Sequence, residues 1–123
     1  MTNSELMKLA EKARENAYAK YSNFKVGAAV LCEDGRIFMG ANVENTCGTS
    51  CCAERVAIHT AVVNGARKFD MIAVAAELGT FPCGICRQTM VEFSPDIRVI
   101  VKTNDGLKEH IASDLLPNAF LQE

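Results

Sequence analysis

The chain has 123 residues, 49% of them hydrophobic, a formal net charge of −2 and a sequence pI of about 5.7. This length predicts one domain over residues 1–123, large enough to bury an apolar core. The slightly acidic balance and the lack of a basic run argue against a nucleic-acid partner. No apolar run approaches the ~18 residues that a membrane span needs, so we expect no membrane partner.

Residues 1–20 predict a cytoplasmic protein, because they carry many charges and lack the apolar segment of a secretory signal. In a reducing compartment, the six cysteines of the chain are expected to be thiols and metal ligands. We therefore read the cysteine pattern as a metal-binding pattern and not as a disulfide framework.

The predicted helices and strands alternate along most of the chain. Amphipathic and apolar patterns predict, in chain order, a helix over 3–19, strands over 25–32 and 37–42, helix 52–64 capped by Ser50, strand 71–76, helix 83–93, strands 97–102 and 108–111, and a short helix at 114–116. Asp34-Gly35 marks the turn of the first hairpin. This order favours an α/β fold in which helices cover a mixed sheet.

Two segments carry a metal-binding pattern, Cys52-Ala53-Glu54 and Pro82-Cys83-Gly84-Ile85-Cys86. This spacing matches the signature of zinc deaminases, with Cys as the first ligand where His is also found. Three thiolates leave the fourth tetrahedral position of Zn²⁺ open for water, which is typical of a catalytic site. Glu54, two residues after the first ligand, is then placed to act as general base and general acid.

The predicted zinc site carries an excess of negative charge. Zn²⁺ with three thiolates has a formal charge of −1, which opposes ionisation of a bound water. Two predicted helix N-termini direct partial positive charge at the ligands. Arg55 and Arg87 each follow a site residue directly, and either could donate a hydrogen bond to a ligand sulfur.

An alternative is a structural zinc site of Cys51, Cys52, Cys83 and Cys86. Consecutive side chains on a helix diverge by about 100°, so Cys51 and Cys52 are poor co-ligands. This alternative also leaves Glu54 without a role.

The remaining cysteines and a nearby histidine are not expected to bind the metal. Cys32, Cys47 and Cys51 are interpreted as small apolar fillers or loop thiols. His59 lies about 10 Å along the predicted helix from Cys52, too far to reach the same zinc. We interpret it as a core or interface histidine.

Motifs across nearly the whole chain resemble those of small homotetrameric zinc-dependent cytidine deaminases. They are Tyr21-Ser22-x-Phe24-x-Val26-Gly27-Ala28-Ala29, Asn42-Val43-Glu44-Asn45, Cys52-Ala53-Glu54-Arg55, Pro82-Cys83-Gly84-x-Cys86-Arg87-Gln88 and Leu115-Leu116-Pro117-x-Ala119-Phe120. The resemblance implies a three-layer α/β/α fold with a mixed five-stranded sheet, a Zn²⁺ cofactor and a homotetramer. It also implies that Phe120 covers the site of a neighbouring subunit.

The resemblance further implies how a pyrimidine nucleoside would be held. Phe24 would stack on the base, since an aromatic ring packs against any planar group. Asn42 and Glu44, two apart on extended backbone, would bind the ribose 3′-hydroxyl. The backbone of Ala53 would contact the base carbonyl, and the carbonyl of Phe81 would accept from the exocyclic amine.

The leading hypothesis is therefore hydrolytic deamination of cytidine and deoxycytidine to uridine and deoxyuridine, with release of ammonia, in pyrimidine salvage. The loop at 46–51 is shorter than in typical members and lacks a Tyr, and Ile85 replaces a small residue. These departures leave open the same chemistry on a modified nucleoside, a free base or a nucleoside antibiotic such as blasticidin S. A non-enzymatic zinc-binding module is the further alternative. A polynucleotide editor is disfavoured by the acidic charge and by the Cys first ligand.

Overall fold

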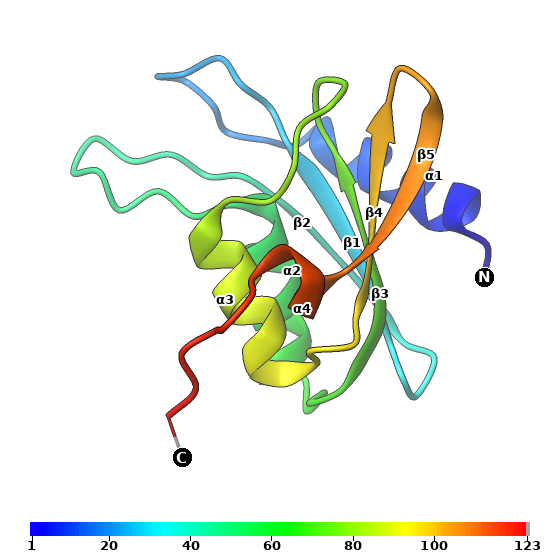
Figure 1. The fold of residues 1–123 in the computed structure, drawn as a ribbon. Helices are drawn as coiled ribbons and strands as arrows, with labels where there is room; N and C mark the ends of the chain where they lie inside the picture. The colour runs from blue at the N-terminus through cyan, green and yellow to red at the C-terminus, as the bar shows by residue number, and fades with distance from the viewer. Residues whose placement is uncertain (123) are drawn as a thin grey trace.

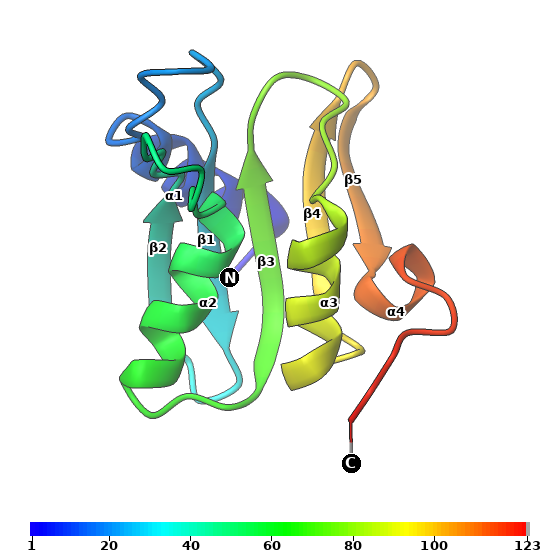
Figure 2. The same ribbon diagram turned by 90° about the vertical axis from the view of Figure 1, so that its left-hand side faces the viewer.

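The computed structural model describes residues 1–122 and has a five-stranded sheet between two layers of helices (Figures 1 and 2). Its elements are α1 (Asn3–Arg14), β1 (Gly27–Cys32), β2 (Ile37–Ala41), α2 (Ala53–Val63), β3 (Phe69–Ala75), α3 (Gly84–Phe93), β4 (Arg98–Thr103), β5 (Gly106–Ile111) and α4 (Ala112–Leu115). The strand order is β2-β1-β3-β4-β5. β3 and β4 are parallel, and the other neighbours are antiparallel. The predicted mixed sheet and three-layer architecture are confirmed.

The helices divide between the two faces of the sheet. α1 packs mainly on β1 and β3 from one face, while α2 and α3 lie on the opposite face (Figure 2). Each face has its own apolar cluster, with Leu6 of α1 packed on one side and Ile58 and Met90 of α2 and α3 on the other. Because helices cover both faces, β1 is apolar throughout, and β3 is apolar apart from the exposed Asp70 near its start.

Two glycines allow the helices to approach the sheet closely. A Cβ on Gly27 would lie 2.1 Å from the carbonyl oxygen of Ala10 in α1. On the other face, a Cβ on Gly40 would lie 2.5 Å from Ala53 O and 2.5 Å from Ala57 N in α2. Gly40 therefore sets the position of the first turn of α2.

We expect Gly40→Ala to destabilise the protein by about 1–3 kcal/mol or more, because the new methyl group must displace the backbone of α2. Thermal unfolding would measure this as a lowered Tm. Met39→Ala is the matched control, since Met39 is the preceding residue of β2 and is 45% exposed. The control should change stability by no more than about 0.5 kcal/mol. Equal Tm values for the two variants would contradict the close approach.

The largest difference from the sequence prediction is the end of the first helix. The predicted helix over 3–19 ends at Arg14, and the prediction for the last five positions is wrong. Tyr18 instead pairs with Val43 as a parallel bridge, with Tyr18 N donating to Asn42 O at 2.9 Å. The amphipathic pattern could not reveal this long-range pairing. The other predicted boundaries lie within two residues of the observed ones.

The start of α2 also differs in detail from the prediction. Ser50 does not cap α2; the N-cap position is occupied by Cys52, whose side chain makes no capping hydrogen bond. Cys83 takes the same N-cap position in α3, again without a side-chain capping bond. Neither sulfur is used to cap its helix, so both are available for other contacts at the helix starts.

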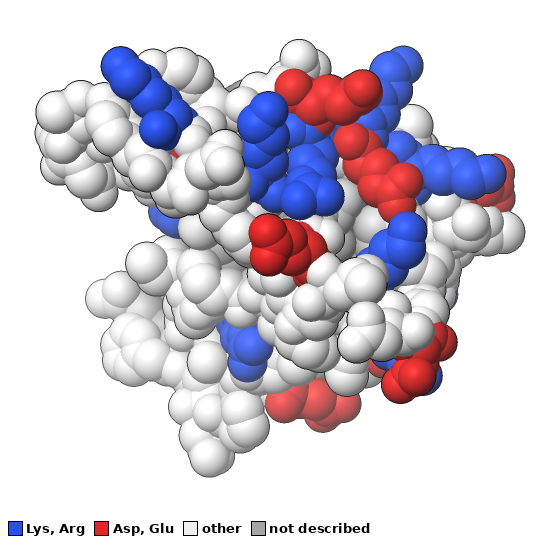
Figure 3. Space-filling model, turned by 90° about the horizontal axis from the view of Figure 1, so that it is seen from above, with Lys and Arg blue, Asp and Glu red and all other residues white. Residues whose placement is uncertain are grey.

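Two observations describe helix length and surface charge. Among residues 1–122, no helix is long and apolar enough to cross a bilayer. Viewed from above, Lys and Arg side chains are mixed with Asp and Glu (Figure 3). This face therefore presents no continuous basic surface.

Candidate metal and substrate site

The two helix starts bring together the three cysteines predicted as ligands. The Sγ atoms of Cys52, Cys83 and Cys86 all lie within 4.8 Å of one another. Cys52 Sγ is 3.7 Å from Cys83 Sγ, which is 3.6 Å from Cys86 Sγ. Cys86 is buried and Cys83 is exposed, so the cluster opens to one side.

The sulfur separations fit one tetrahedral ion. At the usual Zn–S bond length of about 2.3 Å, two sulfurs on a tetrahedral zinc are roughly 3.8 Å apart. A hydrogen bond with Cys86 and the guanidinium of Arg55 lower the pKa of the Cys52 thiol to about 5. The hydrogen bond with Cys52, together with burial, raises the pKa of Cys86 far above its usual range. Such a cluster favours ionisation of all three sulfurs only when a cation balances their charge.

The two arginines next to the site have different roles. Arg55 Nη2 donates to Cys52 Sγ at 3.4 Å, as predicted for one of them. Arg87 instead donates to the backbone, from Nε to Pro82 O at 2.8 Å and from Nη1 to Leu115 O at 2.8 Å. Arg87 therefore ties the segment before Cys83 to the C-terminal part of the chain, and it makes no hydrogen bond to a ligand sulfur within residues 1–122.

Glu54 lies in the first turn of α2 and is only 4% exposed. Burial raises the pKa of its carboxyl to about 7. A buried carboxyl with a raised pKa inside a cleft is typical of a functional site.

Glu54 and two of the cysteines line one small pocket of about 170 Å³. The pocket lies where β2 and β3 end and β1 begins. Its wall is largely apolar and is formed by Phe24, Val26, Asn42, Cys52, Ala53, Glu54, Val74, Thr80, Phe81 and Cys83. The pocket therefore combines two of the three clustered cysteines, a buried carboxyl and two aromatic residues.

The predicted substrate-binding residues fall into two groups. Phe24, Asn42, Ala53 and Phe81 line the pocket. Glu44 and Phe120 do not, and Phe120 is 74% exposed in the C-terminal tail.

Some predictions for residues other than the three clustered cysteines are confirmed, and others are not. Cys32 is buried, and Cys47 is an exposed loop thiol, as interpreted. His59 is exposed in the chain, so it is not a core histidine, and its interpretation as an interface histidine stays a prediction. Ile85 is 63% exposed and does not line the pocket. Thr80 lines the pocket but was missed, and its only sequence signal is a hydroxyl three residues before Cys83.

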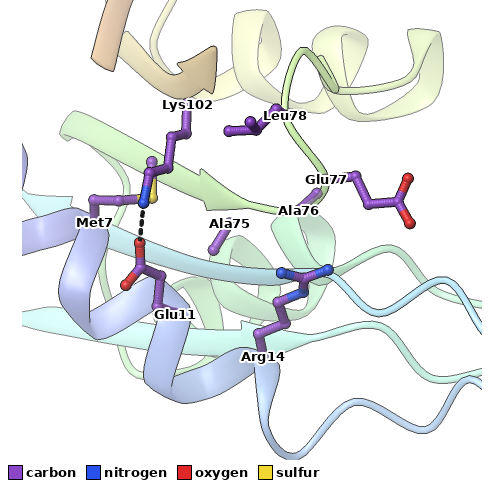
Figure 4. A pocket seen from close by; sticks show the side chains of 8 residues that line it. All are labelled: Met7, Glu11, Arg14, Ala75, Ala76, Glu77, Leu78 and Lys102. Carbon is purple, nitrogen blue, oxygen red and sulfur yellow. Dashed lines mark hydrogen bonds and ion pairs between the residues drawn. The ribbon is translucent and has the colours of Figure 1, made fainter. Parts of the chain in front are cut away.

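A larger hollow of about 460 Å³ lies on the α1 side of the sheet (Figure 4). Glu11 and Lys102 point toward each other there and form an ion pair at 3.4 Å. Arg14 uses its Nε to bind Lys25 O at 2.8 Å. No cysteine or histidine is among the residues that line this hollow. Although it is larger than the pocket beside Glu54, it lacks the cysteine ligands that the predicted zinc site requires.

Comparisons with known proteins agree with this geometry. Residues 1–103 match the family model described as the cytidine and deoxycytidylate deaminase zinc-binding region. A cytidine deaminase of Halalkalibacterium halodurans is 46% identical over 123 residues, covering 96% of this chain and 93% of that protein. One of Sporosarcina psychrophila is 44% identical over 119 residues, covering 93% and 88%.

Solved structures give the same result. The crystal structure of a cytidine deaminase from Burkholderia pseudomallei matches with a TM-score of 0.91 and 44% identity, covering 98% of this chain and 100% of that one. The enzyme from Mycobacterium tuberculosis matches with a TM-score of 0.86 and 32% identity, covering 99% of each chain. The chain belongs to the cytidine and deoxycytidylate deaminase family, whose binding region holds zinc.

Proposed function

We propose that the protein catalyses the zinc-dependent hydrolytic deamination of cytidine and deoxycytidine to uridine and deoxyuridine. The observation that carries this proposal is the buried Glu54 carboxyl in a pocket that is also lined by Cys52, Cys83 and Phe24. The names of the similar proteins support a cytidine substrate.

The proposed roles follow from the lining of the pocket. Cys52, Cys83 and Cys86 would hold the zinc, which when bound supplies Lewis-acid activation of water near neutral pH. Phe24 would stack on one face of the pyrimidine. The backbone of Ala53 would contact the base carbonyl, and Phe81 O would accept from the exocyclic amine.

Glu54 would move the protons of the reaction. It takes a proton from the attacking water and delivers it to ring N3, while the water oxygen bonds to C4. The carboxylate then transfers the second proton of the water to the exocyclic nitrogen, the C4–N bond breaks and ammonia leaves. One carboxyl acting first as base and then as acid must reach both partners, which a site inside the pocket allows.

Substrate class is tested by following ultraviolet absorbance with cytidine, deoxycytidine, cytosine and blasticidin S. We expect turnover of the two nucleosides and little turnover of cytosine, because Asn42 and Glu44 would bind the ribose. Turnover of blasticidin S alone would support the antibiotic alternative. A zinc-loaded protein that acts on none of the four would support the binding-module alternative.

We also propose a cytoplasmic homotetramer in which Phe120 covers the pocket of a neighbouring subunit. Exposed apolar side chains such as Ile85 and Phe120 support burial in an assembly. The tail that carries Phe120 is attached to α3, since Gln88 Nε2 donates to Phe120 O at 2.7 Å. A reducing compartment would keep the ligand thiols available.

We expect Phe120→Ala to lower kcat/KM by about tenfold, since a lost aromatic contact costs about 1–2 kcal/mol. Leu121→Ala, at the next and also exposed position, is the control. Mixing Phe120→Ala subunits with Glu54→Gln subunits should restore part of the activity, because each variant supplies what the other lacks. Sedimentation of the intact protein as a monomer, or no restoration on mixing, would contradict the proposal.

A further inference from the structure

The segment that carries Phe24 has little regular structure of its own. Residues 15–26 contain no helix and no named strand, and only Tyr18 forms an isolated bridge, to Val43. The segment is nevertheless bound to residues 42–44, which follow β2. The position of the Phe24 ring therefore depends on a few individual hydrogen bonds.

Asn42 holds the segment on the C-terminal side of Phe24. Its Nδ2 donates to Phe24 O at 2.8 Å, and its Oδ1 accepts from Val26 N at 2.9 Å. An amide side chain has two N–H groups and two lone pairs, so one of each remains for a ligand.

Glu44 holds the segment on the N-terminal side. Its Oε1 accepts from Tyr21 N at 2.9 Å and from Ser22 N at 3.0 Å, and its Oε2 accepts from the hydroxyl of Ser22. These hydrogen bonds lower the pKa of the Glu44 carboxyl, and the bond from the Ser22 hydroxyl has the largest effect. The carboxyl is therefore held in its ionised form, which only accepts hydrogen bonds. Three bonds leave one acceptor site of the carboxylate for a ligand hydroxyl.

Ser22 connects this carboxylate directly to Phe24. Its hydroxyl has one proton, and an ionised carboxylate can only accept, so the proton points to Glu44. The Ser22 oxygen in turn accepts from Phe24 N at 3.0 Å. Asn23, between the two residues, has a φ of 58°, which Asn tolerates better than most residues. The turn therefore brings the Phe24 amide back onto Ser22.

We propose that Ser22 is a positioning residue that couples the ribose-binding carboxylate of Glu44 to the base-stacking ring of Phe24. Both backbone polar groups of Phe24 are then held by side chains, N–H by Ser22 and C=O by Asn42. A ribose hydroxyl bound to Glu44 would fix the position of the carboxylate and, through it, that of the Ser22 hydroxyl. The bond between Ser22 Oγ and Phe24 N would then fix where the base can stack. This proposal rests on the proposed function, because the ligand is taken to be a pyrimidine nucleoside.

The kinetic test uses Ser22→Ala, Ser22→Thr and Ser50→Ala in the zinc-loaded protein. Ser22→Ala should raise KM for cytidine about tenfold and leave kcat within about twofold, since a hydrogen bond to a charged group is lost and Glu54 is untouched. Ser22→Thr keeps the hydroxyl and should restore KM. Ser50→Ala removes a similar bond, from Asn45 N to Ser50 Oγ at 3.3 Å, and should leave KM nearly unchanged.

A double-variant cycle separates coupling from simple loop damage. If Ser22 acts through Glu44, KM of the Ser22→Ala/Glu44→Ala variant should be no higher than that of Glu44→Ala alone. Additive effects, a fall in kcat without a change in KM, or failure of Ser22→Thr to restore KM would each overturn the proposal.

Amide hydrogen exchange tests the link without any substrate. Exchange of the Phe24 amide should accelerate about fivefold in Ser22→Ala and also in Glu44→Ala, but not in Ser50→Ala. Unchanged Phe24 exchange in Ser22→Ala would overturn the proposal even if cytidine is turned over. Conversely, a wild-type protein inactive on cytidine but with this exchange pattern would refute the proposed substrate and leave the Ser22–Glu44 link standing.

Discussion

Glu54→Gln is expected to lower kcat by at least about 10³-fold, because one carboxyl supplies both the base and the acid of the proposed reaction. Gln has nearly the same shape as Glu but cannot take up or release a proton. Zinc content should stay at the wild-type value, since the three cysteines remain. Single-wavelength absorbance with cytidine, together with metal analysis, measures both quantities.

Glu92→Gln is the matched control for this variant. Glu92 is an exposed residue of α3 that does not line the pocket of Glu54. Its replacement changes a Glu to a Gln without removing the carboxyl that is proposed to transfer protons. We expect wild-type activity from it. Turnover by Glu54→Gln near the wild-type rate would rule out the proposed role of Glu54.

Cys83→Ala is expected to abolish zinc binding and, with it, turnover. Two remaining thiolates cannot complete a tetrahedral site that must also keep one position for water. The far-ultraviolet circular dichroism spectrum should be nearly unchanged, because Cys83 is exposed and belongs to neither apolar cluster. Metal analysis after gel filtration measures the loss of zinc.

Cys47→Ala controls for the loss of a thiol as such. Cys47 is an exposed cysteine outside the cluster, and its Sγ lies 3.1 Å from Thr49 Oγ1. The control variant should bind zinc and turn over cytidine as the wild type does. A Cys83→Ala protein with full zinc content would refute the assigned ligand set.

The sequence was sufficient for the parts of the site set by short spacings. Cys52 and Glu54 share the first turn of one helix, and Cys83 and Cys86 are three residues apart at the start of another, so local geometry dictates their arrangement. The mixed sheet also followed from the alternation of apolar strands and amphipathic helices.

Contacts between distant segments could not be derived in this way. The bond of Arg87 to Leu115 O and the bridge between Tyr18 and Val43 each join residues far apart in sequence. Ser22 appeared in a motif, but no pattern of spacing reveals that its oxygen lies between Glu44 and the Phe24 amide. Such links depend on how loops fold against each other, which periodicity does not encode.

Only one of the three clustered cysteines, Cys86, is part of the buried apolar core, and this has a consequence for the order of assembly. The residues that hold the sheet together, such as Ile72, Val99 and Ile100, are fully buried between helices. Of the three clustered cysteines, Cys86 belongs to the buried core, Cys52 packs against it from a partly buried position, and Cys83 is exposed. Hydrophobic burial can therefore complete the scaffold by itself. Metal uptake then becomes a bimolecular step after folding, whose rate rises with free zinc and which releases thiol protons to the solvent. We therefore expect a folded, zinc-free chain to gain activity at a rate that rises with the concentration of free zinc.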